Sequence, residues 1–180
     1  GVIKVRNKLA ITMSDAAGIG AEIIVKSLAK KEIYDSVIPV VYGDLAAMDD
    51  AIRFTGHTEL TVRSIASIEE AEGTFGTIDL IDFGCLQPGS WEYKKNQAAT
   101  GEASFQYIVR AIGDAMAGKC EGVVTGPISK EAIHMAGHNY SGHTEIFADY
   151  THTRNFAMLL SSDKLRVIHV TTHVSMEQAC

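Results

Sequence analysis

The strongest constraint on the fold is a regular alternation of short apolar runs with helix-like stretches. The clearest helical pattern covers residues 102–117, where apolar residues recur at spacings of three and four and build one stripe. Strands that alternate with helices predict an α/β fold with a mostly parallel sheet flanked by helices. The runs of strand length lie at residues 9–13, 38–42, 60–65, 78–83, 122–125, 156–160 and 165–171, and we expect the last two also to be buried.

Composition limits the function classes. The chain has 180 residues and a formal net charge of −6, which disfavours binding to nucleic acid or to an anionic membrane, because both need a positive surface. No apolar run reaches the ~18 residues of a membrane span. Cys85, Cys120 and Cys180 are widely spaced without a C-x-x-C pair, which argues against a disulfide framework and a structural zinc cluster. We therefore expect a cytoplasmic protein.

Three polar motifs follow or end apolar runs in the second half of the chain. They are residues 125–132 (TGPISKEA), 142–145 (GHTE) and 171–173 (TTH). In open α/β sheets, ligands bind at the carboxyl ends of the strands. The three motifs therefore predict one composite site.

The tetrapeptide GHTE occurs twice, at residues 56–59 and 142–145. Taken alone, a His-Thr pair is more often a helix cap with an exposed histidine than a site. The first copy follows a predicted helix and leads directly into a strand, so we expect Gly56 to cap that helix and His57 to lie in a turn. The second copy lies among the other polar motifs, and we assign function to His143.

Two pairs of histidines have the spacing of four that suggests metal binding. On a strand, four residues span roughly 13 Å, too far for His169 and His173 to share one ion at about 2.1 Å. His173 lies at the predicted strand end, whereas His169 lies inside an apolar run and is expected to be an interior histidine. Gly137 separates His134 from His138, which we expect to be structural or exposed.

The remaining candidates have ordinary explanations as well. Gly18-Ile19-Gly20 lies between a strand and a helix but lacks the third glycine of a dinucleotide fingerprint, so it predicts a tight turn. Lys130 and Glu131 either act at the site or form an exposed first helical turn. Lys94 and Lys95 are expected to be solvated.

These motifs resemble the 4-hydroxythreonine-4-phosphate dehydrogenase family, and residues 11–22 are similar to that family's opening motif. Residues 138–143 and 163–170 look closer to the branch of D-threonate or D-erythronate 4-phosphate dehydrogenases. The resemblance runs from about residue 8 to residue 178. In the opening motif the chain departs from the family by Ser14 in place of glycine and by Ala16 and Ala21 in place of prolines.

The resemblance implies an isocitrate/isopropylmalate-dehydrogenase-like fold and a homodimer with the site in an interdomain cleft. The implied reaction is NAD-dependent oxidation and decarboxylation of a small phosphorylated substrate, with a divalent metal (zinc, magnesium or cobalt). His143 and Thr144 correspond to substrate-binding residues and His173 to a metal ligand, whereas no catalytic residue is assigned.

The family's later motifs NPHAG and YHDQG, which hold the other metal histidines, do not occur in these residues. We therefore expect residues 1–125 to be an incomplete first α/β domain and residues 126–180 to begin a second, cleft- and dimer-forming part, inactive in isolation. Two alternatives stay open. One is an acyl transferase of phosphate-acetyltransferase type, and the other is a non-catalytic anion-binding paralogue.

Overall fold

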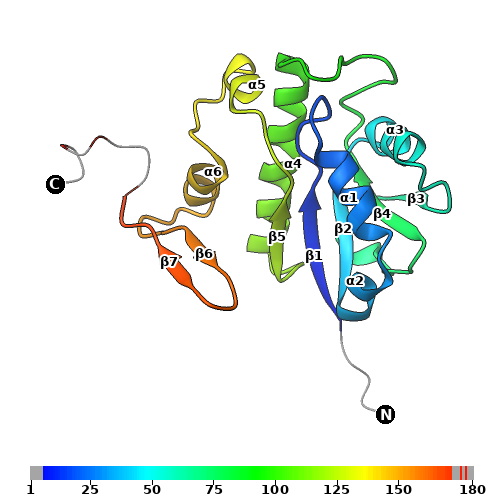
Figure 1. Cartoon of the computed structure of the whole chain (residues 1–180), viewed down its shortest axis with the longest axis horizontal. Helices are drawn as coiled ribbons and strands as arrows, with labels where there is room; N and C mark the ends of the chain where they lie inside the picture. The colour runs from blue at the N-terminus through cyan, green and yellow to red at the C-terminus, as the bar shows by residue number, and fades with distance from the viewer. Residues whose placement is uncertain (1–5, 172–174, 176, 178–180) are drawn as a thin grey trace, which may run out of the picture.

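Five parallel strands form the main sheet (Figure 1). The structure is a computed structural model and describes residues 6–171, 175 and 177. Across the sheet the strands follow the order β3-β4-β2-β1-β5, and each adjacent pair is parallel. This confirms the predicted mostly parallel α/β sheet. The strands are β1 (Asn7–Thr12), β2 (Val37–Gly43), β3 (Thr61–Ile65), β4 (Thr77–Asp82) and β5 (Gly122–Thr125).

Helices cover both faces of the sheet. The connection from β4 to β5 runs across the sheet in the opposite direction to the connection from β1 to β2, so right-handed crossovers place their helices on opposite faces. In Figure 1, α4 lies behind β1 and β5, whereas α1 and α2 lie in front. The helices are α1 (Gly20–Leu28), α2 (Lys31–Ser36), α3 (Leu45–Thr55), the 3-10 turn η1 (Ile68–Glu70), α4 (Ala98–Met116), α5 (Lys130–Met135) and α6 (His143–Tyr150).

Two helices differ from the sequence-based expectation. The short helix α2 was not predicted, because six residues are too few to show a helical period. Helix α4 begins at Ala98, four residues earlier than predicted, and includes Gly101. A Cβ atom on Gly101 would lie 2.0 Å from the carbonyl oxygen of Ala132. The glycine is therefore required by the close approach of α5 to α4, and it does not end the helix.

Two apolar clusters hold these layers together. The larger one fills the space between the sheet and its helices and includes Val40, Val41 and Leu80, all fully buried. The smaller one joins α4, α5 and α6 through Ile108, Ile133 and Ile146, each at most 1% exposed. The second cluster fixes the two short helices that follow the sheet.

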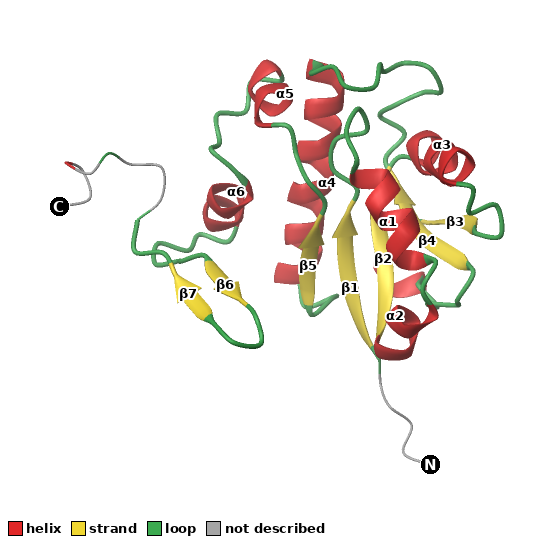
Figure 2. Ribbon diagram, in the orientation of Figure 1, coloured by secondary structure: helices red, strands yellow, loops and turns green. Residues whose placement is uncertain are grey.

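Two further strands were predicted at residues 156–160 and 165–171, and the prediction that they are buried is wrong. Strands β6 (Leu159–Ser161) and β7 (Arg166–Ile168) form a separate antiparallel hairpin, and all their residues are exposed. Figure 2 shows this hairpin apart from the main sheet, next to α6. A parallel pair needs a crossover of a dozen or more residues, and the connection here is only four residues long.

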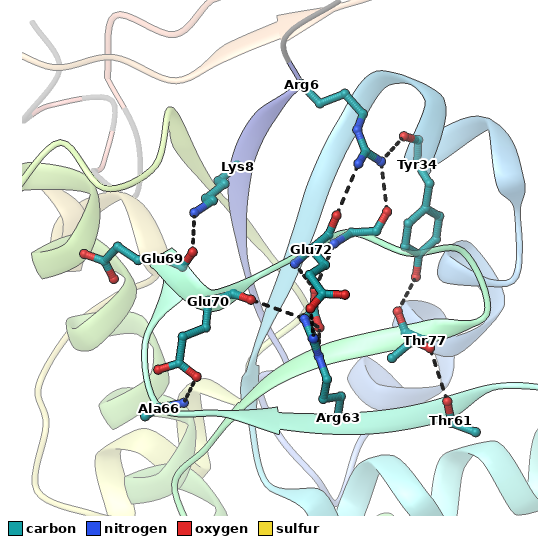
Figure 3. Close-up of polar contacts among 12 residues, drawn as sticks. Arg6, Lys8, Tyr34, Thr61, Arg63, Ala66, Glu69, Glu70, Glu72 and Thr77 are labelled. Atoms are coloured by element: carbon teal, nitrogen blue, oxygen red, sulfur yellow. Dashed lines mark hydrogen bonds and ion pairs between the residues drawn. The ribbon is translucent and has the colours of Figure 1, made fainter.

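A polar cluster connects the segments around β3 and β4, at the edge of the sheet far from β5 (Figure 3). Arg6 donates to the carbonyl oxygens of Tyr34 (2.8 Å) and Gly73 (2.9 Å). Arg63 donates to the Asp79 carboxylate through Nε (2.8 Å), and the backbone N–H groups of Glu72 and Gly73 donate to its other oxygen. Asp79 is 2% exposed, so these donors compensate the burial of its charge. The cluster stabilises the β3–β4 edge.

None of the helices in the described part of the chain combines the length and the apolar composition that crossing a bilayer requires.

Candidate functional site

The three polar motifs meet at one pocket. We call it the α5–α6 pocket; its volume is about 320 Å³. The first motif contributes Lys130, the second contributes Gly142 and Thr144, and the third contributes Thr171. Segments about forty residues apart in the sequence therefore line one cavity. Polar side chains of Ser141, Glu145, Arg154 and His169 also line it.

The first motif leaves the sheet at the end of β5. The Gly126 N–H donates to the Thr12 carbonyl (3.0 Å), and the Ser14 hydroxyl donates to the Gly126 carbonyl (2.8 Å). Ser14 has φ 67°, a left-handed conformation that favours glycine. It stands where the resembling family carries glycine, and its hydroxyl gains a hydrogen bond there. The loops after β1 and β5 are thus joined.

Helix α5 then begins at Lys130 in a fixed position. Ser129 is its N-cap: its hydroxyl oxygen accepts from the Ala132 N–H (3.1 Å) and donates to the Asn96 side chain (2.7 Å). Ala132 is fully buried in the contact with Gly101. Lys130 therefore extends into the pocket from an anchored helix.

His143 begins α6 between Gly142 and Thr144, which both line the pocket, whereas His143 itself is not among the lining residues. Its ring is half-buried, and within the described residues its Nε2 atom is buried without a hydrogen-bond partner. Burial lowers the pKa of His143 below its usual value, because desolvation disfavours the charged imidazolium. A neutral imidazole with one unused nitrogen can hydrogen-bond a hydroxyl or a carboxylate of a ligand.

The other GHTE copy is built differently. Gly56 has φ 76° and caps α3, and the His57 carbonyl accepts from the Leu60 N–H (3.0 Å) in a turn. The His57 side chain pairs with Glu59 at 3.0 Å (Nδ1 to Oε1). This confirms the predicted cap and turn, and it leaves His57 outside the pocket.

The third motif is described only up to Thr171, and His173 lies outside the described residues. His169 follows β7 and lines the α5–α6 pocket, so the prediction that it is an interior histidine is wrong. The reason is that β7 is exposed and belongs to a hairpin. Among the described residues, no group of three or more His, Cys, Asp or Glu side chains could hold a metal ion.

His134 and His138, the other pair with a spacing of four, have structural partners. His138 lies against Phe105, with ring centroids 3.6 Å apart, and its Nε2 atom is 2.7 Å from a Glu102 carboxylate oxygen. His134 is hydrogen-bonded to the Tyr140 carbonyl (2.9 Å). Both contacts hold the loop between α5 and α6, so these histidines support the pocket without lining it.

The loop after β1 lines a neighbouring hollow of about 290 Å³, together with Lys94, Lys95 and Ser129. A Cβ atom on Gly20 would lie 2.1 Å from the Met13 carbonyl oxygen, so this glycine serves close packing between loop and helix. Asp15 is buried, and its carboxylate accepts from the Ala17 N–H (2.9 Å). The predicted tight turn is confirmed, and a dinucleotide fingerprint is not formed here.

The sequence reading missed Arg154 as a pocket residue. It lies in the irregular segment between α6 and β6, where no apolar period or motif marks it. Its position depends on the turn that follows α6, in which the Thr153 N–H donates to the Ala148 carbonyl (2.9 Å). Only the tertiary structure brings Arg154 to the same pocket as Lys130.

The parallel sheet and the pocket beside its edge define an α/β protein of the kind in which enzymes bind small molecules. Residues 35–180 match the family described as pyridoxal phosphate biosynthetic protein PdxA. The chain belongs to this family.

Similar proteins carry the names of dehydrogenases. The chain is 43% identical to D-threonate 4-phosphate dehydrogenase of Cupriavidus necator over 95% of its length and 51% of that protein. The identity is also 43% to the Salmonella typhimurium protein of the same name, over 94% and 52% of the two chains. The chain thus spans about half the length of the curated relatives it matches.

Solved structures agree in fold. The structure of a 4-hydroxythreonine-4-phosphate dehydrogenase from Burkholderia phymatum matches with a TM-score of 0.89 and 40% identity, over 97% of this chain and 52% of that one. A terephthalate 1,2-cis-dihydrodiol dehydrogenase from Burkholderia xenovorans matches with a TM-score of 0.68 and 26% identity, over 97% and 50%.

Proposed function

We propose that the complete protein is a dehydrogenase of a phosphorylated four-carbon hydroxy acid. The expected substrate is D-threonate or D-erythronate 4-phosphate in preference to 4-hydroxythreonine 4-phosphate. The observation that carries the proposal is the 43% identity to D-threonate 4-phosphate dehydrogenase over 95% of the chain. The α5–α6 pocket supports it, because the pocket is polar and has room for a small acid.

The proposed reaction is the oxidation of a secondary alcohol to a ketone, followed by loss of the substrate carboxylate as carbon dioxide. The hydride goes to NAD, and the hydroxyl proton is released. In this chain we assign His143 and Thr144 to substrate binding. The buried, unpartnered Nε2 atom of His143 supports that role, since a ligand hydroxyl or carboxylate would satisfy it.

Divalent metal dependence, with zinc, magnesium or cobalt, is part of the same proposal, and His173 is the proposed ligand in this chain. The described residues offer no three-ligand set, so we derive no step through the metal. Replacing His173 by alanine in the complete protein should lower its bound metal, measured by elemental analysis. Unchanged metal content in that variant would remove the assignment.

We further propose that residues 1–125 belong to a first domain and that residues 126–180 begin a second, cleft- and dimer-forming part. The end of the main sheet at Thr125 supports the boundary. The exposed apolar hairpin supports a homodimer. A cytoplasmic location is supported by the free thiols of Cys85 and Cys120.

The names of the relatives favour this dehydrogenase over the acyl-phosphate transferase.

The deciding experiment measures kcat/KM of the complete protein with NAD and each phosphorylated acid. We expect a preference for D-threonate or D-erythronate 4-phosphate, because a site built for the hydroxyl next to the carboxylate leaves an ammonium unpaired. Preference for the amino acid phosphate would reverse the substrate assignment. No turnover of any of the acids would favour the non-catalytic paralogue.

A further inference from the structure

We propose that Lys130 and Arg154 form an oxyanion-binding pair in the α5–α6 pocket and hold one charged end of the substrate. The inference rests on the proposed function for the identity of the substrate. Its core is that two cationic side chains, from α5 and from the segment after α6, line one pocket of about 320 Å³. Such a pocket recognises a carboxylate or a phosphate.

Neither cation is neutralised in the described part of the chain. Some cationic side chains elsewhere have carboxylate partners, such as Arg110 with Asp114 at 3.0 Å and Lys119 with Asp114 at 3.4 Å. Within the described residues, no carboxylate lies within 4.0 Å of the charged nitrogens of Lys130 or Arg154. On a chain with a formal charge of −6, two cations that line the same pocket give it a local excess of positive charge.

Two neighbouring carboxylates leave the pocket with an excess of positive charge. Glu131, next to Lys130, accepts from the Asn96 side-chain amide (2.7 Å). Asn96 in turn accepts from the Ser129 hydroxyl (2.7 Å), so Glu131 belongs to the cap of α5. Glu145 is the one carboxylate among the pocket-lining residues, and the two cations outnumber it.

The lysine is held against the substrate-binding segment. A Cβ atom built on Gly142 would lie 3.9 Å from Lys130 Cε, so the lysine stem passes beside the residue that precedes His143. The same point lies 3.5 Å from a Glu145 carboxylate oxygen. Because Gly101 and Ala132 lock α5 onto α4, the lysine approaches from a rigid element, which lowers the entropic cost of binding.

The test uses the complete protein with Lys130→Ala, Lys130→Gln and Lys130→Arg, together with Arg154→Ala. Lys31→Ala is the matched control, because Lys31 is exposed in α2 and does not line the α5–α6 pocket. We expect Lys130→Ala to raise KM for D-threonate 4-phosphate about tenfold or more, the scale of a lost hydrogen bond to a charged group. The change in kcat should be smaller, and Lys130→Arg should restore most of the affinity. Arg154→Ala should raise KM in the same direction.

Calorimetric binding of two probes, inorganic phosphate and D-threonate, identifies which end is held. If Lys130→Ala weakens only phosphate binding, the pair holds the phosphate end; if it weakens only D-threonate binding, the pair holds the carboxylate end. Unchanged binding of both probes, or equal losses in Lys31→Ala, would overturn the proposal. If the wild-type protein oxidises none of the acids, the proposed function fails, and the probe binding still decides on the pocket.

Discussion

At the residue scale, the repeated GHTE tetrapeptide shows that the same four residues can occupy two different structural environments. His57 and His143 have identical sequence neighbours on both sides. His57 lies in a turn and pairs with its own Glu59, whereas His143 begins a helix and keeps a buried nitrogen without a partner among the described residues. The first copy follows the end of α3, whereas the second copy begins α6.

The two copies make a matched pair for mutation. We expect His143→Ala in the complete protein to lower kcat/KM by a factor that corresponds to about 1.5–3 kcal/mol, because a ligand would lose a hydrogen bond. His57→Ala should change kcat/KM little. Steady-state kinetics on both variants decides, and the opposite order of effects would show that the functional copy is the first one.

The lowered pKa of His143 predicts a pH dependence of stability. Burial lowers the folded-state pKa below the ordinary value of 6.5, so the unfolded chain binds more protons between the two values. This contribution to stability is therefore complete above about pH 6.5 and decreases as the pH falls below it.

Denaturant melts of the complete protein between pH 5 and 8 should show the decrease, and His143→Gln should reduce it. His57→Gln is the control: it measures how much the pH dependence of stability changes when a different histidine is removed. Equal flattening by both substitutions would contradict the assignment to His143.

At the element scale, the contact between α4 and α5 positions the pocket. The closest point is Gly101, where a side-chain Cβ atom would lie 2.0 Å from the Ala132 carbonyl oxygen. The second apolar cluster, which includes Ile133 and Ile146, extends this contact to α6. The positions of the Lys130 and Thr144 side chains therefore depend on the contact between α4 and α5, which is too close to admit a methyl group at Gly101.

Two glycines of α4 test this contact in opposite directions. Gly101→Ala should destabilise the protein by about 1–3 kcal/mol or more, since backbone atoms must move apart. Gly113→Ala, in the same helix with open space around its Cβ position, should stabilise it by roughly 0.5–1 kcal/mol. Thermal melting separates the two outcomes. A neutral or stabilising Gly101→Ala would contradict the close contact.

At the scale of the whole molecule, apolar surface is concentrated on the β6–β7 hairpin. Leu159, Leu160 and Ile168 are each more than half exposed, and Val170 beyond the hairpin is 96% exposed. Exposed apolar side chains concentrated on one element are typical of an interaction site. It supports the proposed homodimer, with the hairpin in the interface.

A charge in the hairpin should therefore weaken the dimer. We expect light scattering of the complete wild-type protein to give the mass of a dimer and Leu160→Glu to shift it toward a monomer, because burial of the carboxylate is unfavourable. Phe54→Glu is the control, since Phe54 is 52% exposed in α3, which lies across the main sheet from the hairpin (Figure 1). A monomeric wild-type protein, or dissociation by both substitutions, would exclude this interface.

The sequence by itself determined the parallel sheet, the long helix α4 apart from its first turn, and the cap at Gly56. These features depend on local periodicity and on backbone preferences of single residues, which a sequence records directly. Only the tertiary structure decided that Arg154 joins Lys130, that a ring nitrogen of His143 is buried without a partner among the described residues, and that the last two strands are exposed. Burial, charge pairing and close approach are relations between segments distant in the chain, and no local pattern encodes them.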